Sequence, residues 1–316
     1  MPWLPFLLAV IGLPIAAALA FCLMGERLIL HPPRPQSRQQ PPGGEEVTFP
    51  ACDGVPIHGW YFPVSRPRGV VAYSSGRGRG LNSFDFRYIP LFNRHDYSLL
   101  LFDARGLGAS GGVSSMGALE WRDYLGAADY LASRGMHRVG FCGGSQGGAS
   151  AILAAAQCPA VVAVVAESAY ASWETTLFFA LCSYAHLPPV LARPGAWLLA
   201  RWLGLRLGFR PRDAEPARDI AALAPRAFFL IHGPHDPYIP TSEVQRLFDA
   251  AGQPKELWIL PEAGHTQALE LRPEECEARI IAFFDRWLST SADPVGQAQP
   301  GEHSDHQGNT ATGPKG

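Results

Sequence analysis

Arg138-Val-Gly-Phe-Cys-Gly-Gly-Ser-Gln-Gly-Gly148 is the stretch that decides the fold. It begins with a short apolar run, Val139–Cys142, that predicts a buried strand. The alanine-rich run Ala149–Ala156, which follows the glycines, predicts a helix. Between the two, Gly143-Gly-Ser-Gln-Gly147 places Ser145 on a sharp turn, where neighbours without side chains let strand and helix pass closely. Strand, G-x-S-x-G and helix together predict a nucleophilic serine beside a helix N-terminus, which favours a developing negative charge.

Length and composition favour one sizeable globular domain with extra segments at its ends. The chain has 316 residues, of which 47% are hydrophobic, and a formal net charge of -2. Because basic and acidic residues balance, no nucleic-acid partner is expected. The six cysteines are scattered without metal-ligand spacing, which predicts buried small hydrophobic residues rather than disulfides. Neither a metal nor another cofactor is expected.

The N-terminal segment Trp3–Met24 has 22 residues without a charge, enough to span a bilayer as a helix. We predict a transmembrane anchor over residues 1–25 and a linker rich in Pro and Gln over residues 26–44. The alternative is a cleaved signal peptide, because Ala18-Leu-Ala20 resembles a cleavage site. The length of the run and the lack of a preceding Lys or Arg favour the uncleaved anchor.

The charges that flank this segment predict its orientation. Three arginines follow the span and none precedes it: Arg27, Arg34 and Arg38. The positive-inside bias therefore predicts a single-pass membrane protein whose globular part lies in the cytoplasm.

The remaining chain alternates apolar runs with helical patterns. A hairpin is predicted over residues 46–62, turning near Asp53-Gly54. Further strands are expected at residues 69–73, 97–102, 139–142, 161–166, 227–231 and 256–260, and helices at 119–133, 149–156, 242–251 and 274–288. This order predicts an α/β domain over residues 45–288 with a mainly parallel sheet flanked by helices. Residues 289–316 are poor in apolar side chains and predict a disordered tail.

A serine nucleophile needs a base that takes its proton and an acid that orients the base. In one known chain order the acid and then the histidine follow the serine. Asp236 comes just after the apolar run 228–231, and His265 just after the run 257–260. The carboxyl ends of parallel strands meet at one edge of a sheet, so Ser145, Asp236 and His265 are predicted to form a catalytic triad. Glu167 is the alternative acid.

The other histidines near these positions are less suitable as the base. His232 and His235 lie too early in this order, and His303 and His306 lie in the predicted tail.

An oxyanion formed beside Ser145 needs preorganised N–H donors. One predicted donor is the backbone N–H of Gln146, the residue after the nucleophile. The second is expected from the loop Ser74-Ser-Gly-Arg-Gly-Arg-Gly80, and Arg77 is the residue chosen. A plain flexible loop is the alternative. A phosphate-binding loop is disfavoured, because the Lys-Ser/Thr ending is missing.

Four segments occur in the order of a known family. They are Phe102-Asp-Ala-Arg-Gly-Leu-Gly-Ala-Ser-Gly111, the elbow at Ser145, the HG-x-x-D element ending at Asp236, and Gly264-His265. With them the chain resembles the α/β-hydrolase superfamily over about residues 45–288. The anchor followed by Glu26–Pro32 looks like its membrane-anchored subgroup, related to serine aminopeptidase-like and acyl-ester hydrolases.

The resemblance implies an α/β-hydrolase fold with a helical cap inserted at about residues 168–225. It also implies that Asp103 and Arg105 belong to a structural turn. Two departures concern the site. Ser75-Gly76 stands where the family usually has His-Gly, and Gly144 is often a larger residue.

The predicted cap is rich in large apolar side chains. They are Trp173, Leu177, Phe178, Phe179, Leu187, Trp197, Leu198, Leu199 and Trp202. They suit an acyl chain or a bilayer surface, whose anionic headgroups could meet Arg193, Arg201, Arg206 and Arg210. Alternatively, these residues only pack the cap onto the core.

The sequence thus predicts a membrane-anchored serine hydrolase that cleaves a carboxylic ester or thioester through an acyl-enzyme. Its expected partners are a small-molecule or lipid-like acyl substrate and the bilayer. One alternative is an exopeptidase with the same triad, although no acid pair that would bind a substrate amine stands out in the cap. Another is a non-catalytic membrane adaptor on a hydrolase fold.

Overall fold

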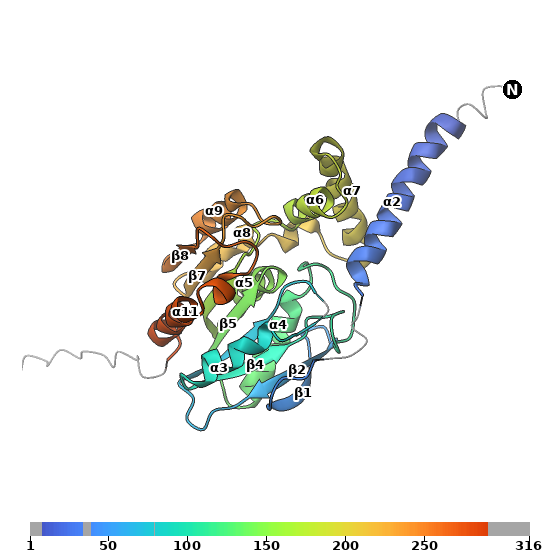
Figure 1. Cartoon of the computed structure of the whole chain (residues 1–316). Coiled ribbons are helices and arrows are strands. Elements are labelled where there is room, and N and C mark those ends of the chain that lie inside the picture. The colour runs from blue at the N-terminus through green and yellow to red at the C-terminus, as the bar shows by residue number, and fades with distance from the viewer. Residues whose placement is uncertain (1–7, 34–38, 79, 290–316) are drawn as a thin grey trace, which may run out of the picture.

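An eight-stranded sheet forms the centre of the molecule (Figure 1). The computed structural model describes residues 8–33, 39–78 and 80–289. The strands are β1 (Glu45–Pro50), β2 (Pro56–Phe62), β3 (Gly69–Ser74), β4 (Tyr97–Phe102), β5 (Val139–Gly144), β6 (Val161–Glu167), β7 (Ala227–His232) and β8 (Lys255–Ile259). Their order across the sheet is β1-β2-β4-β3-β5-β6-β7-β8. This is the α/β-hydrolase fold, as predicted.

The sheet is antiparallel at one edge and parallel elsewhere. β1 and β2 form the predicted hairpin, and Gly54 takes a left-handed conformation in its turn with φ of +84°. β2 pairs antiparallel with β4, and every later pair is parallel. The strands β4 and β5 are buried along their whole length, because helices cover both faces of the parallel part.

Helices cover the two faces of the sheet in separate layers. One layer contains α4 (Trp121–Ser133), α5 (Gln146–Gln157) and α9 (Thr241–Ala250), and the other contains α3 (Tyr88–Asn93) and α11 (Pro273–Trp287). The core is therefore divided by the sheet into two clusters of buried apolar side chains. Short helices lie between these longer elements: η2 (Asp85–Arg87), η3 (Pro211–Ala214), α8 (Pro216–Asp219), η4 (Ile220–Leu223) and α10 (Ala268–Leu271).

Asp103 and Arg105 stabilise the loop after β4. The Asp103 carboxylate accepts the N–H groups of Leu81 at 2.7 Å and Ala109 at 3.1 Å. The Arg105 guanidinium pairs with Asp123 at 2.7 Å and with Asp53 at 2.8 Å. Both side chains are buried, and together they tie the loop to the hairpin turn and to α4.

Two helices inserted between β6 and β7 lie above the sheet. α6 (Trp173–Ser183) and α7 (Pro189–Leu207) pack on each other within the predicted cap. Trp173 is fully buried and donates from its indole to the carbonyl of Ser115 at 3.0 Å, so part of the apolar content packs the cap onto the core. The last part of the predicted insertion differs from the prediction: α8 and η4 pack on α5, because Ile220 and Leu223 are buried there.

The cap arginines contact neighbouring side chains. Arg201 pairs with Glu174 at 2.6 Å, and Arg193 lies over the ring of Phe178. Arg206 pairs with Glu26 at 3.1 Å.

A long N-terminal helix leaves the body of the molecule beside the cap (Figure 1). The π-helix η1 (Leu8–Gly12) continues into α2 (Leu13–Leu30). In the described part of the chain, one helix is long and apolar enough to cross a membrane: Val10–Leu30, 21 residues with a mean hydropathy of 1.8. A signal sequence has the same features.

The predicted end of this helix at residue 25 is wrong. The helix continues to Leu30, because Ile29 and Leu30 are buried against the core and Glu26 is bound to the cap. Arg34 and Arg38 of the predicted linker lie outside the described residues, as does the predicted tail beyond Ser289.

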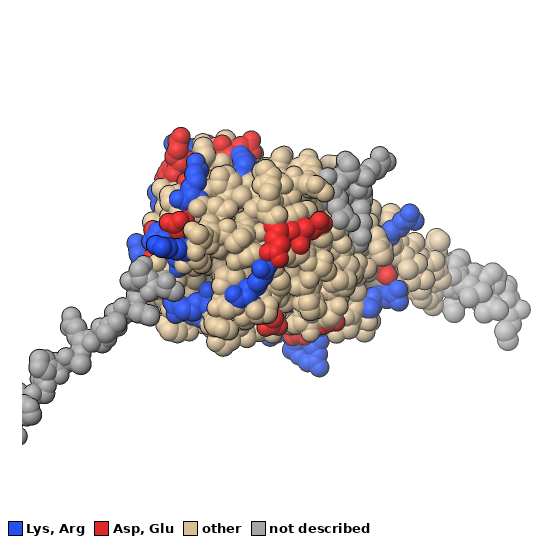
Figure 2. All heavy atoms as spheres, turned by 90° about the horizontal axis from the view of Figure 1, so that it is seen from below, with Lys and Arg blue, Asp and Glu red and all other residues tan. Residues whose placement is uncertain are grey.

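All six cysteines are free. Cys22, Cys142 and Cys276 are buried, but Cys52 is exposed, contrary to the prediction, because it lies in the β1–β2 turn. On the face seen from below, acidic and basic side chains of the described residues are interspersed over a largely uncharged surface (Figure 2).

Candidate active site

Ser145 lies at the junction of β5 and α5 in a strained conformation. Its φ is +53° and its ψ is -120°, which a residue with a side chain rarely adopts. Its N–H donates to the carbonyl of Glu167 at 2.7 Å, and its own carbonyl accepts the N–H of Ala149 at 3.0 Å. Gly147 must lack a side chain, since a Cβ there would lie 2.1 Å from the carbonyl oxygen of Ser74. The missing side chain of Gly147 therefore allows α5 to pack closely on the end of β3.

Tyr124 of α4 holds the strand ends beneath this turn. Its hydroxyl accepts the N–H of Ser74 at 3.0 Å and donates to the carbonyl of Cys142 at 2.7 Å. These bonds join the carboxyl ends of β3 and β5, which carry the predicted oxyanion loop and Ser145. The sequence predicted a helix over residues 119–133, but the polar role of Tyr124 within it was missed.

His265 and Asp236 form a close pair. The Nδ1 atom of His265 lies 2.7 Å from Oδ2 of Asp236, while Oδ1 accepts the N–H groups of Tyr238 and Ile239, both at 2.9 Å. Burial alone would raise the pKa of Asp236, but the hydrogen bonds from His265 and the two N–H groups outweigh it and lower that pKa. An ionised Asp236 holds the proton of His265 on Nδ1, which leaves Nε2 as an acceptor.

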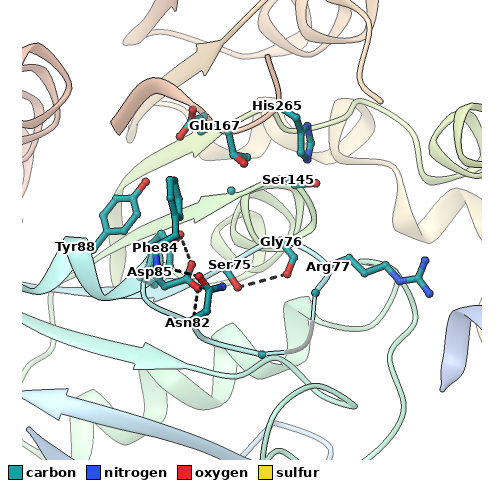
Figure 3. A pocket seen from close by; sticks show the side chains of 15 residues that line it. Ser75, Gly76, Arg77, Asn82, Phe84, Asp85, Tyr88, Ser145, Glu167 and His265 are labelled. Carbon is teal, nitrogen blue, oxygen red and sulfur yellow. Dashed lines mark hydrogen bonds between the residues drawn. The ribbon is translucent and has the colours of Figure 1, made fainter. Parts of the chain in front are cut away.

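The imidazole of His265 lies beside Ser145 (Figure 3). The rings of Tyr238 and His265 pack in a T-shaped arrangement, with centroids 5.0 Å apart and planes at 87°. Ser145 and His265 line the same two cavities, so the structure brings together the three residues predicted as a triad.

Glu167, the alternative acid, has a different partner. Its carboxylate accepts the N–H of Ala268 at 2.8 Å. Burial raises its pKa to about 7 against the opposing effects of this hydrogen bond and of His265. His232 lies behind the pair, with Nδ1 4.0 Å from Oδ2 of Asp236, and burial lowers its pKa. Asp236 is thus the carboxylate that directly bonds His265.

The predicted oxyanion residues Gln146 and Arg77 line one of the cavities that contain Ser145. Gln146 is the first residue of α5, so its N–H has no acceptor within the helix. Gly76 packs directly on Ser145, since a Cβ there would lie 2.9 Å from Cβ of Ser145. The next residue is Arg77, whose side chain turns away from the serine in Figure 3.

Glu120 also stabilises this region and was missed from the sequence. Its carboxylate accepts the N–H of Ser115 at 2.7 Å and of Gly117 at 2.8 Å, and the side-chain amide of Gln146 at 3.2 Å. These contacts fix the loop before α4 against the start of α5.

Two cavities meet at Ser145 and His265. One, of about 190 Å³, lies beside the oxyanion loop and includes Asp85, Tyr88 and Glu167 in its lining. The other, of about 290 Å³, lies under the cap and has no acidic residue in its described lining. Asp85 accepts hydrogen bonds from Tyr73 at 3.0 Å and Asn82 at 2.8 Å, and burial raises its pKa to about 6. The site combines a serine, a carboxylate-bound imidazole and a cavity on each side.

No group of three or more His, Cys, Asp or Glu side chains suited to a metal ion occurs in the described ranges.

Comparison with known proteins gives the following relationships. The model of the prolyl oligopeptidase family matches residues 82–291. The uncharacterised protein Rv2307c of Mycobacterium tuberculosis is 28% identical over 302 residues, covering 90% of this chain and 98% of that protein. The uncharacterised protein YqkD of Bacillus subtilis is 28% identical over 249 residues, covering 76% of this chain and 80% of that protein.

Solved structures share the fold. The Pyrococcus furiosus esterase Pf2001 superposes with a TM-score of 0.69 at 23% identity, covering 83% of this chain and 99% of the esterase. The Pyrococcus horikoshii acylaminoacyl peptidase superposes with a TM-score of 0.61 at 18% identity, covering 82% of this chain and 44% of the peptidase. Because the sequence identities are this low, these two comparisons show only that the chains share a fold.

Proposed function

Because this chain belongs to the prolyl oligopeptidase family of α/β-fold serine hydrolases, we propose that it is a membrane-anchored hydrolase of carboxylic esters or thioesters. The observation that carries the proposal is the arrangement around Ser145. Ser145 lies on a strained elbow, and the imidazole beside it is bound to a buried carboxylate at 2.7 Å.

In the proposed mechanism Ser145 Oγ attacks the acyl carbonyl carbon while His265 Nε2 takes the hydroxyl proton. The carbonyl oxygen becomes an oxyanion, which the N–H groups of Gln146 and Arg77 stabilise. Each such donor contributes on the order of 10²–10³ in rate. The C–O or C–S bond then breaks, and His265 gives its proton to the departing alcohol or thiol.

Water completes the proposed cycle. It loses a proton to His265 as it attacks the acyl-serine ester. Collapse of the second tetrahedral intermediate releases the carboxylic acid and returns the proton to Ser145. Asp236 orients His265 in both halves and stabilises the imidazolium.

The absence of acidic side chains from the described lining of the cavity under the cap supports an ester or thioester substrate. Its described lining includes Met116, Tyr170, Ala180 and Ile239 and no carboxylate that would bind a substrate amine. The cavity beside the oxyanion loop does contain two acids, but Asp85 and Glu167 already accept hydrogen bonds from neighbouring groups.

A serine exopeptidase is the second candidate. It is favoured by the name of the family and by the position of Asp85 and Glu167 in the cavity beside Ser145. In that case these carboxylates would bind the α-amine of a peptide, and the same triad would cleave its amide.

The substrate test compares p-nitrophenyl acyl esters with aminoacyl p-nitroanilides, using the full chain in detergent micelles. We expect kcat/KM for the esters to be at least about 10³-fold higher than for the anilides, and both activities to be lost in Ser145→Ala. Preferential cleavage of anilides with a free α-amine, lost in Asp85→Asn or Glu167→Gln, would establish the exopeptidase.

The proposal also includes the position of the protein in the membrane. The apolar length of α2 supports an uncleaved single-pass anchor, and Arg27 in its last turn supports a cytoplasmic hydrolase domain.

A further inference from the structure

A third cavity lies where the N-terminal helix meets the cap. Its volume is about 230 Å³. α2 contributes Leu28 and Ile29, α6 contributes Leu177 and Leu181, and α7 contributes Leu199. Apart from Arg77 and the hydroxyl of Tyr184, the described residues of its lining are apolar. Such a largely apolar lining suits a hydrocarbon chain.

This cavity adjoins the one that contains Ser145. Both are lined by Arg77, Met116, Ala180 and Tyr184, which therefore form their common wall. A chain attached to a carbonyl at Ser145 that reaches α2 would follow a path past these four residues.

The outer end of this path lies on an exposed flank of α2. Leu28 lines the cavity and is 63% exposed. The exposed side chains Leu23 and Met24 lie one turn earlier on the same helix. In a chain whose α2 spans the bilayer, the third cavity opens at the edge of the membrane.

Specific contacts fix α2 in this position. The Glu26 carboxylate accepts the indole N–H of Trp202 at 2.6 Å and pairs with Arg206 at 3.1 Å. Gly25 packs on Leu199 so closely that a Cβ would lie 2.8 Å from its Cδ1. The N–H of Ser114 donates to the carbonyl of Leu30 at 3.3 Å. The last turns of α2 are therefore an integral part of the hydrolase body.

Arg77 links α2 to the oxyanion loop. Its guanidinium donates to the carbonyl of Leu28 and contacts the sulfur of Met116 at 3.8 Å. The carbonyls of the last helical turn lack partners within the helix, and a cation is favourable there. The residue whose backbone N–H is assigned to the oxyanion thus also closes the end of the helix that forms the cavity wall.

We propose that the third cavity binds the aliphatic chain of an acyl ester or thioester, with α2 forming one wall of the substrate site. This inference rests on the proposed esterase function and specifies its substrate: an acyl chain that extends from Ser145 to the junction of α2 and the cap. The helix then has two roles, since it anchors the enzyme and selects the substrate.

The test measures kcat/KM for p-nitrophenyl esters from two to sixteen carbons, using the full chain in nanodiscs. In the wild type we expect kcat/KM to rise with chain length. Ala185→Trp fills the cavity from the cap side and Leu28→Trp fills it from α2, and each should lower the ratio of long-chain to short-chain kcat/KM by at least about tenfold. Leu205→Trp is the matched control on an exposed residue of α7 outside the cavity, and it should keep the wild-type ratio.

The source of the chain is distinguished by presenting the same esters dissolved in solution and incorporated in phosphatidylcholine vesicles. A higher rate from vesicles indicates a bilayer lipid, and a higher rate from solution indicates a soluble acyl thioester or ester.

Thermal unfolding of each variant shows whether it is folded. Leu181→Ala enlarges the cavity and should shift the preference of the enzyme to esters with longer acyl chains.

Suppose that Ala185→Trp and Leu28→Trp fold and keep the wild-type ratio of long-chain to short-chain kcat/KM, while ester cleavage still depends on Ser145. That result would overturn this inference and leave the esterase function intact. The absence of any Ser145-dependent ester cleavage in the wild type would instead refute the proposed function itself.

Discussion

At the scale of single residues, the hydrogen bond between Asp236 and His265 determines which imidazole nitrogen faces the serine. Asp236→Asn keeps the shape of the side chain but removes the charge that holds the proton on Nδ1. We expect kcat for an ester to fall by about 10³–10⁴-fold with little change in KM. Asp249→Asn on α9, whose carboxylate only accepts a hydrogen bond from Gln245, is the matched control. Steady-state kinetics that show less than a tenfold loss in Asp236→Asn would contradict the assigned role.

Glu167 makes folding stability depend on pH. Burial raises the pKa of its carboxyl from an ordinary 4.5 to about 7 in the folded state. Between these values the folded chain binds more protons than the unfolded chain, so the free energy of unfolding decreases as the pH rises. The decrease amounts to on the order of 2–3 kcal/mol.

Glu167→Gln removes this titration and should flatten the decrease between about pH 4.5 and 7. Denaturant unfolding at pH 5 and pH 7.5 measures the effect, and Glu256→Gln at an exposed ion pair is the control. A variant that loses as much stability over this range as the wild type would show that Glu167 does not titrate there.

At the scale of elements, the close packing of α5 on the end of β3 shapes the nucleophile elbow. Gly147→Ala would place a methyl group 2.1 Å from the Ser74 carbonyl oxygen, which forces the helix and the strand apart. We expect a loss of about 1–3 kcal/mol in unfolding free energy, together with displacement of Ser145. In Gly78→Ala the added methyl group meets no atom within 4 Å, so the thermal midpoint should stay close to that of the wild type. Equal midpoints for the two variants would contradict this packing account.

Local sequence patterns predicted most of these elements. Apolar runs between glycines marked the buried strands, and the carboxyl ends of those strands carry Ser145, Asp236 and His265 at one edge of the sheet. Contacts between distant segments were not predictable in this way. The end of α2 depends on Trp202 and Arg206, which are 176 and 180 residues away from Glu26 in the chain. The hydrogen bonds of Tyr124 were not predictable either. A helical pattern indicates that a side chain is buried, but not which carbonyl its hydroxyl will bind.

At the scale of the whole molecule, α2 presents exposed apolar side chains along the part that lies away from the body. Leu19, near the middle of Val10–Leu30, is 46% exposed. In a membrane-spanning helix an arginine at this position costs about 2.5–3.5 kcal/mol. Leu19→Arg should therefore increase the fraction released from membranes by alkaline carbonate, whereas Leu205→Arg on the exposed side of α7 should not. Complete release of the wild-type chain would contradict the anchor and favour a cleaved signal sequence.

Ser145 and His265 line two cavities beside the loop after β3 and the cap, and α2 lines the adjoining third cavity. The most direct test of the central claim is labelling of the full chain in membranes by a fluorophosphonate, which reacts with an activated serine. Wild type and Ser150→Ala, a serine one turn further along α5, should label equally. Labelling should vanish in Ser145→Ala and fall by at least about 10²-fold in His265→Ala. A folded wild type that does not label, or a Ser145→Ala variant that labels as fast as the wild type, would contradict the account.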